Sequence, residues 1–311
     1  MRRWLLSDDI GARHGAILSW ANPHHPGYAY PEAAGLFLST VCGSAFAAQA
    51  WQAPADRSAA WLCAALDADG GVGRGGITYL FDSAVALAGL LRYRAAGGRV
   101  GGDEPIHRLR AFICAQIPAG VAVLPPSASA DGRWSTQFGA HLVKCLHSLH
   151  LYAAAFGDRV RDDLVAALIN RSGHQPSPLY LHPFCYEQEG HFIVAHYGLP
   201  SLFEPVDGAL DLLVALQQPN GGLLAFANGM DGFGEPRADA TAQAVRLWLL
   251  RDRTRYAASI ARGLAFLASC QTAAGGIRYA PARDDVCSWS TMFSLQAVEW
   301  FATAPRPDEL L

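Results

Sequence analysis

The residues best suited to catalysis lie between positions 182 and 189. His182, Tyr186 and Glu189 recur at spacings of four and three residues, which places their side chains on one face of a helix. A carboxylate and a histidine in a partly dry cavity can act as general base and general acid, and a tyrosine beside them can orient or protonate a substrate. Cys185 and His191 fall on other faces of this helix, so we expect no metal and no cofactor. The sequence therefore predicts acid–base catalysis with Glu189 as the base.

Polar residues also stand at the start of other apolar stretches. Free backbone N–H groups and the positive end of the helix dipole would meet a substrate at such positions. Asp82 is a second candidate for the catalytic base. Further side chains are predicted to bind substrate: Tyr30, Glu32, Trp134, Gln137, Asp239, Trp289 and Thr291. Helix capping is the alternative for the carboxylates and hydroxyls, because Asp, Ser and Thr are ordinary N-caps and Glu is favourable in a first turn.

Two cations share helical faces with these residues. Lys144 follows Gln137 by seven residues and His141 by three, and Arg246 follows Asp239 by seven. We expect His141, Lys144 and Arg246 to line the substrate cavity, where the cations would hold an anionic group. The alternatives are a lysine stem that reaches solvent and pairing with a carboxylate of a neighbouring helix, which would neutralise either cation.

The elements that must position these residues are helical. Apolar residues recur at helical spacing in many windows, and no segment alternates with period two for long enough to predict a strand. Helix start and stop signals predict about twelve helices in two alternating sets. The first set is 8–20, 56–66, 103–117, 158–170, 206–217 and 255–270. The second set is 32–51, 82–95, 135–155, 184–197, 239–251 and 289–302.

Equivalent polar positions near the starts of the second set recur at intervals of 50, 55, 49, 53 and 51 residues, which indicates a repeat of about fifty: Glu32, Asp82, Gln137, Tyr186, Asp239 and Ser290. A helix pair of this size cannot bury both its faces alone, so successive pairs must stack, and six can close into a ring. The second set is nearly uncharged and is predicted to be the inner layer, while the first set carries the charge expected of outer helices. Long glycine-rich connections precede the inner helices. We therefore expect the side chains at these ends to converge on one cavity: Glu32, Asp82, His182, Tyr186, Glu189 and Asp239.

Three turns carry a family resemblance. Residues 66–71 (LDADGG), 216–222 (LQQPNGG) and 269–276 (SCQTAAGG) are similar to the Gln-x-x-x-Gly-Gly turn of squalene-cyclase-like proteins. The chain thereby resembles the α/α-toroid superfamily, which includes terpenoid cyclases, protein prenyltransferase β subunits and six-hairpin carbohydrate enzymes. The aspartate-rich motifs of terpenoid cyclases and the zinc ligands of prenyltransferases are not recognisable, so the resemblance extends to the scaffold only. It implies an all-α fold, an (α/α)6 toroid formed by 1–311 as a single domain.

Composition excludes several classes of protein. Of the 311 residues 51% are hydrophobic and 16% charged, which is inconsistent with a disordered chain. The net charge of −3 provides no basic surface for nucleic acid. No apolar stretch is long enough for a signal peptide or a membrane span. Seven cysteines, none in a CxxC pattern, favour a reduced, cytoplasmic protein.

We therefore predict a metal-independent enzyme of the lyase or cyclase type. It would act on a small polar, amine-bearing metabolite by elimination, epimerisation or ring closure with loss of an anionic group, as in specialised metabolite biosynthesis. One alternative is a six-hairpin carbohydrate hydrolase or lyase that stacks sugars on Trp134, Tyr186 and Trp289. A second alternative is a non-catalytic scaffold subunit, whose low charge would reflect a permanent protein partner.

Overall fold

The computed structural model describes residues 1–11, 15–25, 27–43, 48–117, 139–172 and 177–311. The described chain forms two compact units. The first contains 1–10, 19–28 and the chain beyond 175, and the second contains 11–18 and 29–174. Among the described residues, no helix combines the length and hydrophobicity that a membrane span requires.

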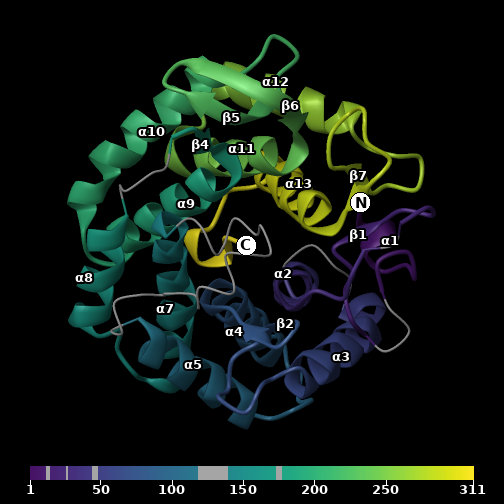
Figure 1. Ribbon diagram of the computed structural model, residues 1–311, viewed down its shortest axis with the longest axis vertical. Coiled ribbons are helices and arrows are strands. Elements are labelled where there is room, and N and C mark those ends of the chain that lie inside the picture. The colour runs from purple at the N-terminus through teal and green to yellow at the C-terminus, as the bar shows by residue number, and fades with distance from the viewer. Residues whose placement is uncertain (12–14, 26, 44–47, 118–138, 173–176) are drawn as a thin grey trace. The chain divides into compact units, whose positions relative to one another are not determined.

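The first unit has five long helices with short strands between them (Figure 1). Helix α11 packs against both α9 and α13, and α10 and α12 lie on the outer side of this layer. Its elements are α1 Arg2–Leu5, β1 Trp20–Ala21, β4 Leu179–Tyr180, α9 Leu181–Tyr197, η3 Pro200–Leu202, α10 Phe203–Leu216, β5 Leu223–Asn228, β6 Asp231–Arg237, α11 Ala238–Asp252, α12 Ala257–Ser269, β7 Ile277–Arg278, β8 Val286–Cys287, α13 Ser288–Ala302 and η4 Pro307–Glu309.

The second unit repeats this arrangement. Helix α4 packs against α2 and α7, with α3 and α5 on the outer side. Glycines allow the close approach of α2 and α4, because a Cβ added at Gly89 would lie 2.4 Å from the carbonyl oxygen of Gly35. Its elements are α2 Pro31–Val41, α3 Ala48–Ala64, β2 Gly73–Arg74, β3 Ile77–Thr78, α4 Leu80–Ala95, α5 Glu104–Gln116, η2 Ala140–Lys144, α7 Cys145–Phe156 and α8 Asp162–Arg171.

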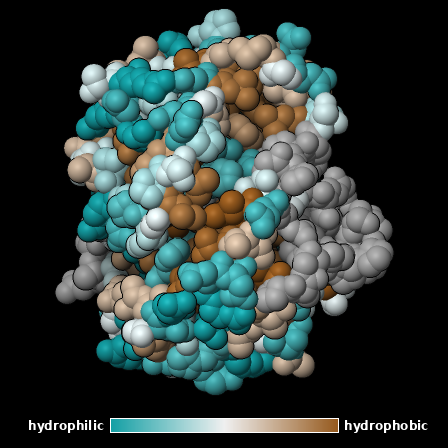
Figure 2. Space-filling model, turned by 90° about the vertical axis from the view of Figure 1, so that its left-hand side faces the viewer, coloured by the Kyte–Doolittle hydropathy of each residue, from teal (hydrophilic) through white to brown (hydrophobic). Residues whose placement is uncertain are grey.

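The predicted division into apolar inner helices and charged outer helices is confirmed. Trp248 of α11 is fully buried in a core shared with α9, α10 and α12. The outer helix α10 carries Asp207, which accepts two hydrogen bonds of 2.7 and 2.8 Å from Arg251 near the end of the inner helix α11. On the face shown in Figure 2, hydrophilic side chains predominate and hydrophobic ones gather in patches between them.

The Gly-Gly turns have one structure in all three places. The first glycine, at 70, 221 and 275, has a φ of 92°, 88° and 101°, which favours glycine. At the second glycine an added Cβ would lie within 3 Å of an aromatic ring: Phe112 of α5 for Gly71, Phe266 of α12 for Gly222 and Trp4 of α1 for Gly276. Glycine at this position therefore lets a neighbouring helix pack closely against each turn.

In each of three inner helices, a hydroxyl in the first turn connects the helix to the chain that follows the preceding Gly-Gly turn. Ser83, Thr241 and Thr291 donate to the carbonyls of Tyr79, Arg237 and Cys287 at 2.7, 2.6 and 2.7 Å. The same hydroxyls accept from the backbone N–H groups of Val72, Leu223 and Ile277 at 2.9, 2.9 and 2.8 Å. Each hydroxyl therefore satisfies a buried backbone donor that no strand or helix would satisfy.

Several predicted elements are wrong. The described part of 8–20 forms no helix, because Ile17, Leu18 and Trp20 enter short antiparallel pairings. The predicted helix 32–51 ends at Val41, and a separate helix, α3, begins at Ala48. Residues 218–238 contain a β-hairpin, with strands β5 and β6 joined across Gly229 and Met230. Gly229 has a φ of 56°, and glycine at the first position of a two-residue connection is typical of a type II′ hairpin turn.

Candidate active site

A buried ion pair lies where β6 meets α11. Arg237 donates to both carboxylate oxygens of Asp239, at 3.1 and 2.6 Å, and to the hydroxyl of Tyr180 at 3.1 Å. Its guanidinium lies 3.5 Å from the ring centroid of Tyr279. Burial raises the pKa of Asp239, but the charges of Arg237 and His182, together with the hydrogen bonds from Arg237 and the N–H of Ala240, outweigh burial, and the pKa is lowered. Asp239 is therefore ionised and neutralised by Arg237.

His182 of α9 joins this pair from the neighbouring helix. Its Nδ1 lies 2.6 Å from Oε1 of Gln243 and 3.7 Å from Oδ2 of Asp239. Burial lowers the pKa of His182, so the ring is neutral at pH 7 and its Nδ1 donates to Gln243. The ring of Tyr186 lies 4.9 Å away. The structure thus brings together the predicted site residues His182, Tyr186 and Asp239.

A second buried ion pair lies two turns further along the same helices. Arg246 of α11 donates to Glu189 of α9 and to Gln296 of α13, the latter at 2.9 Å. Both charged side chains are fully buried, and the guanidinium lies 4.2 Å from the ring centroid of Phe293. Arg246 therefore pairs with a carboxylate of a neighbouring helix, as the alternative interpretation of Arg246 predicts. The roles of Glu189 as a base and of Arg246 as an anion holder remain predictions.

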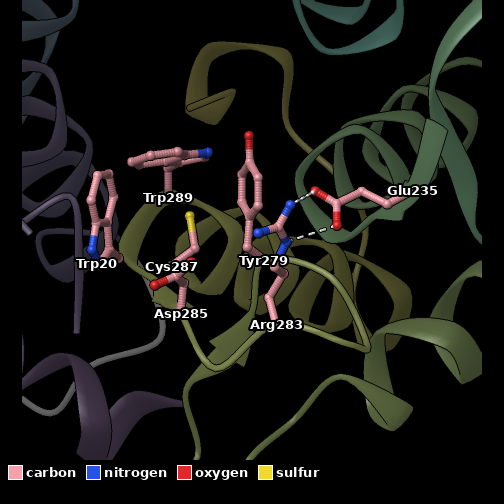
Figure 3. Close-up of a pocket in the computed structure, with 7 residues that line it drawn as sticks. All are labelled: Trp20, Glu235, Tyr279, Arg283, Asp285, Cys287 and Trp289. Atoms are coloured by element: carbon pink, nitrogen blue, oxygen red, sulfur yellow. Dashed lines mark hydrogen bonds and ion pairs between the residues drawn. The ribbon is translucent and has the colours of Figure 1, made fainter. Parts of the chain in front are cut away.

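A pocket of about 260 Å³ opens beside the first ion pair (Figure 3). Trp289, on the first turn of α13, lines the pocket and also contacts the ion pair, since its indole N–H donates to Asp239 at 3.3 Å. In Figure 3 Glu235 and Asp285 lie on opposite sides of Tyr279, and Arg283 pairs with Glu235 at 2.9 Å. The pocket is lined by Trp20, Glu235, Tyr279, Arg283, Asp285, Cys287 and Trp289.

A polar cluster at the pocket edge was not predicted. Asn22 donates to Oδ1 of Asp285 at 2.8 Å, and Nε2 of His25 lies 3.5 Å from the same oxygen. The indole N–H of Trp20 donates a hydrogen bond of 3.0 Å to the carbonyl oxygen of His25. Pairing of β1 with β8 creates the cluster, because Trp20 lies opposite Cys287 in the register. A half-buried carboxylate beside a histidine can transfer protons to a bound molecule.

The other predicted site residues belong to the second unit. The Tyr30 hydroxyl donates to Glu32 at the start of α2. Asp82 and Lys144 are buried, and the buried His141 packs edge-on against Phe81 at 5.2 Å. Convergence of these side chains with those of the first unit remains a prediction. Trp134 and Gln137 lie outside the described residues.

The inner helices begin earlier than the polar residues suggest. Tyr79 is the N-cap of α4, so Asp82 occupies the first turn, and the N-cap alternative for Asp82 is wrong. Glu32 and Asp239 likewise follow N-caps at Tyr30 and Arg237. All three N-cap residues have extended backbone; Arg237 is the last residue of β6, and Tyr79 directly follows β3. Thr291 is occupied by its two hydrogen bonds to the backbone, and its contact with substrate remains a prediction.

Comparison with known proteins identifies the fold. No family model and no curated protein matches the sequence. An unsaturated glucuronyl hydrolase from Bacillus sp. GL1 has a TM-score of 0.67 at 11% identity, covering 97% of this chain and 95% of the other. A glycosyl hydrolase family 88 protein from Bacteroides vulgatus has a TM-score of 0.62 at 10% identity, covering 92% and 93%. A polysaccharide lyase has a TM-score of 0.59 at 11% identity, covering 90% and 93%.

These structures share the six-hairpin α/α-toroid scaffold, and the predicted fold class is confirmed. Identities this low establish the fold alone, so the chemistry has to be argued from the residues of this chain.

Proposed function

We propose that this protein is a carbohydrate enzyme, a hydrolase or lyase acting on saccharides that carry a carboxylate. The observation that carries the proposal is the pocket, which combines aromatic walls, a cation and two carboxylates. Sugar-processing enzymes use two carboxylates that flank the scissile bond. The shared scaffold of the glucuronyl hydrolase and the polysaccharide lyase supports the same substrate class.

Binding would use the aromatic walls and the arginine. The rings of Trp20, Tyr279 and Trp289 offer apolar faces against which the C–H face of a pyranose can pack. Arg283 presents a guanidinium that suits a carboxylate in two-point hydrogen bonding. The guanidinium of Arg283 donates to the carboxylate of Glu235 in this structure, so a uronate would compete with Glu235 for the Arg283 N–H groups.

Proton transfer would fall to Asp285. Its side chain is 22% exposed, and Asn22 and His25 hold it at the pocket edge. In hydrolysis an acid donates a proton to the leaving oxygen as a water molecule attacks the anomeric carbon. In elimination a base removes the C5 proton next to the uronate carboxylate, a C4–C5 double bond forms as the C4–O bond breaks, and an acid protonates the leaving oxygen. Cys287 is excluded as a nucleophile, because burial raises the pKa of its thiol.

Product analysis of the full chain with uronate oligosaccharides tests the proposal. The panel contains saturated and unsaturated glucuronyl oligosaccharides and neutral oligosaccharides as controls. Elimination creates the ultraviolet absorbance of a C4–C5 double bond, whereas hydrolysis of an unsaturated substrate removes it. We expect one of these changes with uronates and none with neutral sugars. No product from any uronate would refute the proposal.

A pair of variants tests the assignment of Asp285. We expect Asp285→Asn to lower turnover by about 10²–10⁴ while the melting temperature stays unchanged. The matched control is Asp284→Asn, because Asp284 is the adjacent carboxylate and is exposed. Full activity of folded Asp285→Asn would show that another group transfers the proton.

An amine-bearing metabolite is the second candidate substrate, as predicted from the sequence. Glu235 and Asp285 supply negative charge, and an ammonium group over Trp289 or Trp20 would gain cation–π attraction. Binding of simple primary amines, measured by calorimetry, separates the candidates. Amine binding without uronate binding would favour the second.

A further inference from the structure

We propose that Arg237 and Asp239 form a positioning unit that holds two walls of the pocket, the rings of Tyr279 and Trp289, in one fixed arrangement. The kinetic part of this inference rests on the proposed function, whereas the structural part does not. Neither Arg237 nor Asp239 lines the pocket, and the Asp239 side chain is completely buried. Both would therefore act on a bound molecule through the aromatic rings.

Each wall is attached to a different partner of the ion pair. The guanidinium of Arg237 lies 3.5 Å from the centroid of the Tyr279 ring. Oδ2 of Asp239 accepts both from Arg237 at 2.6 Å and from the Trp289 indole at 3.3 Å. The two rings themselves meet edge to face, with centroids 6.1 Å apart. Movement of the ion pair would therefore move both walls together.

The backbone extends the same unit to the proposed catalytic group. The N–H of Ala238, between the two charged residues, donates to the carbonyl of Tyr279 at 3.0 Å. The N–H of Tyr279 donates in turn to the carbonyl of Asp285 at 2.9 Å. The chain of contacts from Arg237 thus reaches the loop that carries Asp285.

Electrostatics keep the unit rigid. Asp239 binds Arg237 through both carboxylate oxygens and receives the N–H of Ala240 at 2.8 Å. Two-point pairing of a guanidinium with a carboxylate fixes the plane of both groups. Because the pKa of Asp239 is lowered, the pair remains ionised throughout the neutral pH range.

Fluorine NMR of the full chain labelled with 5-fluorotryptophan tests the structural part without any ligand. Trp289→Phe identifies the Trp289 signal. We expect Asp239→Asn and Arg237→Gln to shift or broaden that signal. The matched control is Asp207→Asn, which breaks another two-point Arg–Asp pair on α11, that of Arg251, and should leave the signal in place.

A single substitution in the pair leaves a buried lone charge and can prevent folding. The double variant Arg237→Gln/Asp239→Asn removes both charges together and keeps a folded sample available. An unchanged Trp289 signal in the folded variants would overturn the inference. A shifted signal in the variants, with an unchanged signal in Asp207→Asn, would support it.

Kinetics with a uronate oligosaccharide that the wild type converts separates positioning from catalysis. For Arg237→Lys, which keeps the charge but loses the planar contact with Tyr279, we expect KM to rise about tenfold and kcat to change less than about threefold. An unchanged KM, or a fall in kcat alone, would overturn a positioning role. If the wild type converts no saccharide, the proposed function fails, and the NMR result alone decides this inference.

Discussion

Replacement of Glu189 by glutamine distinguishes a catalytic base from a structural partner. If Glu189 is the base, the sequence alone predicts that Glu189→Gln lowers turnover by about 10²–10⁴ with little change in melting temperature. If Glu189 is only a first-turn helix residue, the same substitution should lower the free energy of unfolding by about 0.3–1 kcal/mol. The structure predicts a larger cost, because Glu189→Gln leaves the guanidinium of Arg246 without a negative partner. Gln296 and the ring of Phe293 would remain beside it.

The magnitude follows from burial. Both side chains of the pair are 0% exposed, and removing one partner of a buried ion pair costs about 3–5 kcal/mol. Unfolding entropy of about 2.1 cal/mol/K per residue gives roughly 650 cal/mol/K for 311 residues. The expected fall in melting temperature is therefore about 5–8 °C.

Thermal unfolding followed by circular dichroism measures this fall, and turnover is assayed well below the transition. The double variant Glu189→Gln/Arg246→Met removes the lone charge and should recover much of the lost stability. A melting temperature within about 1 °C of wild type for Glu189→Gln would refute the structural argument. A loss of turnover in folded Glu189→Gln would support the prediction that Glu189 is the base.

Three further predictions concern stability. Thr241→Val, which leaves the buried N–H of Leu223 without an acceptor, should cost about 1–3 kcal/mol in denaturant unfolding, and a loss below about 0.5 kcal/mol would contradict it. Gly89→Ala should destabilise by about 1–3 kcal/mol despite its better helix propensity, because the new methyl meets Gly35; a gain in stability would count against this contact. Burial lowers the pKa of His191 from 6.5 to about 4, so the unfolded state binds a proton that the folded state does not. Stability should therefore fall by about 3 kcal/mol as the pH falls from about 6.5 to 4, and His191→Gln should remove that part of the slope.

Most of the fold could be predicted because its signals are local. The Gly-Gly turns and the apolar inner helices repeat at about fifty residues, and in the structure a neighbouring helix packs closely against the glycines of each turn. The segment 8–20 could not be predicted in this way, since Trp20 is held by pairing with Cys287, 267 residues away in sequence. The signal for the β5–β6 hairpin was present in Gly229, the first residue of the two-residue turn Gly229-Met230, which follows alternating buried and half-buried residues.

The site was predicted only in part, for a related reason. His182 and Asp239 were singled out because they lie in the first turns of inner helices, and Tyr186 because it shares a helical face with His182. The structure brings the three together, and their role in catalysis or substrate binding remains a prediction. Arg237 was missed because it ends a strand that was not predicted. Asn22 and His25 were missed because they lie between the predicted helices 8–20 and 32–51, in a segment where Pro23 and Pro26 indicate a loop.

The burial of the carboxylates separates structural from catalytic roles. Asp239 and Glu189 are completely buried, and each is paired with an arginine. Asp239 and Arg246, one from each pair, are seven residues apart on α11, which is two turns or about 10 Å. A carboxylate so enclosed could meet a substrate only if the side chains around it moved. Asp285, by contrast, is 22% exposed and hydrogen-bonded to an amide, so it can meet a substrate in its present position. Burial of the two ion pairs therefore favours a structural role for them, and it is the reason for proposing Asp285 as the group that transfers the proton.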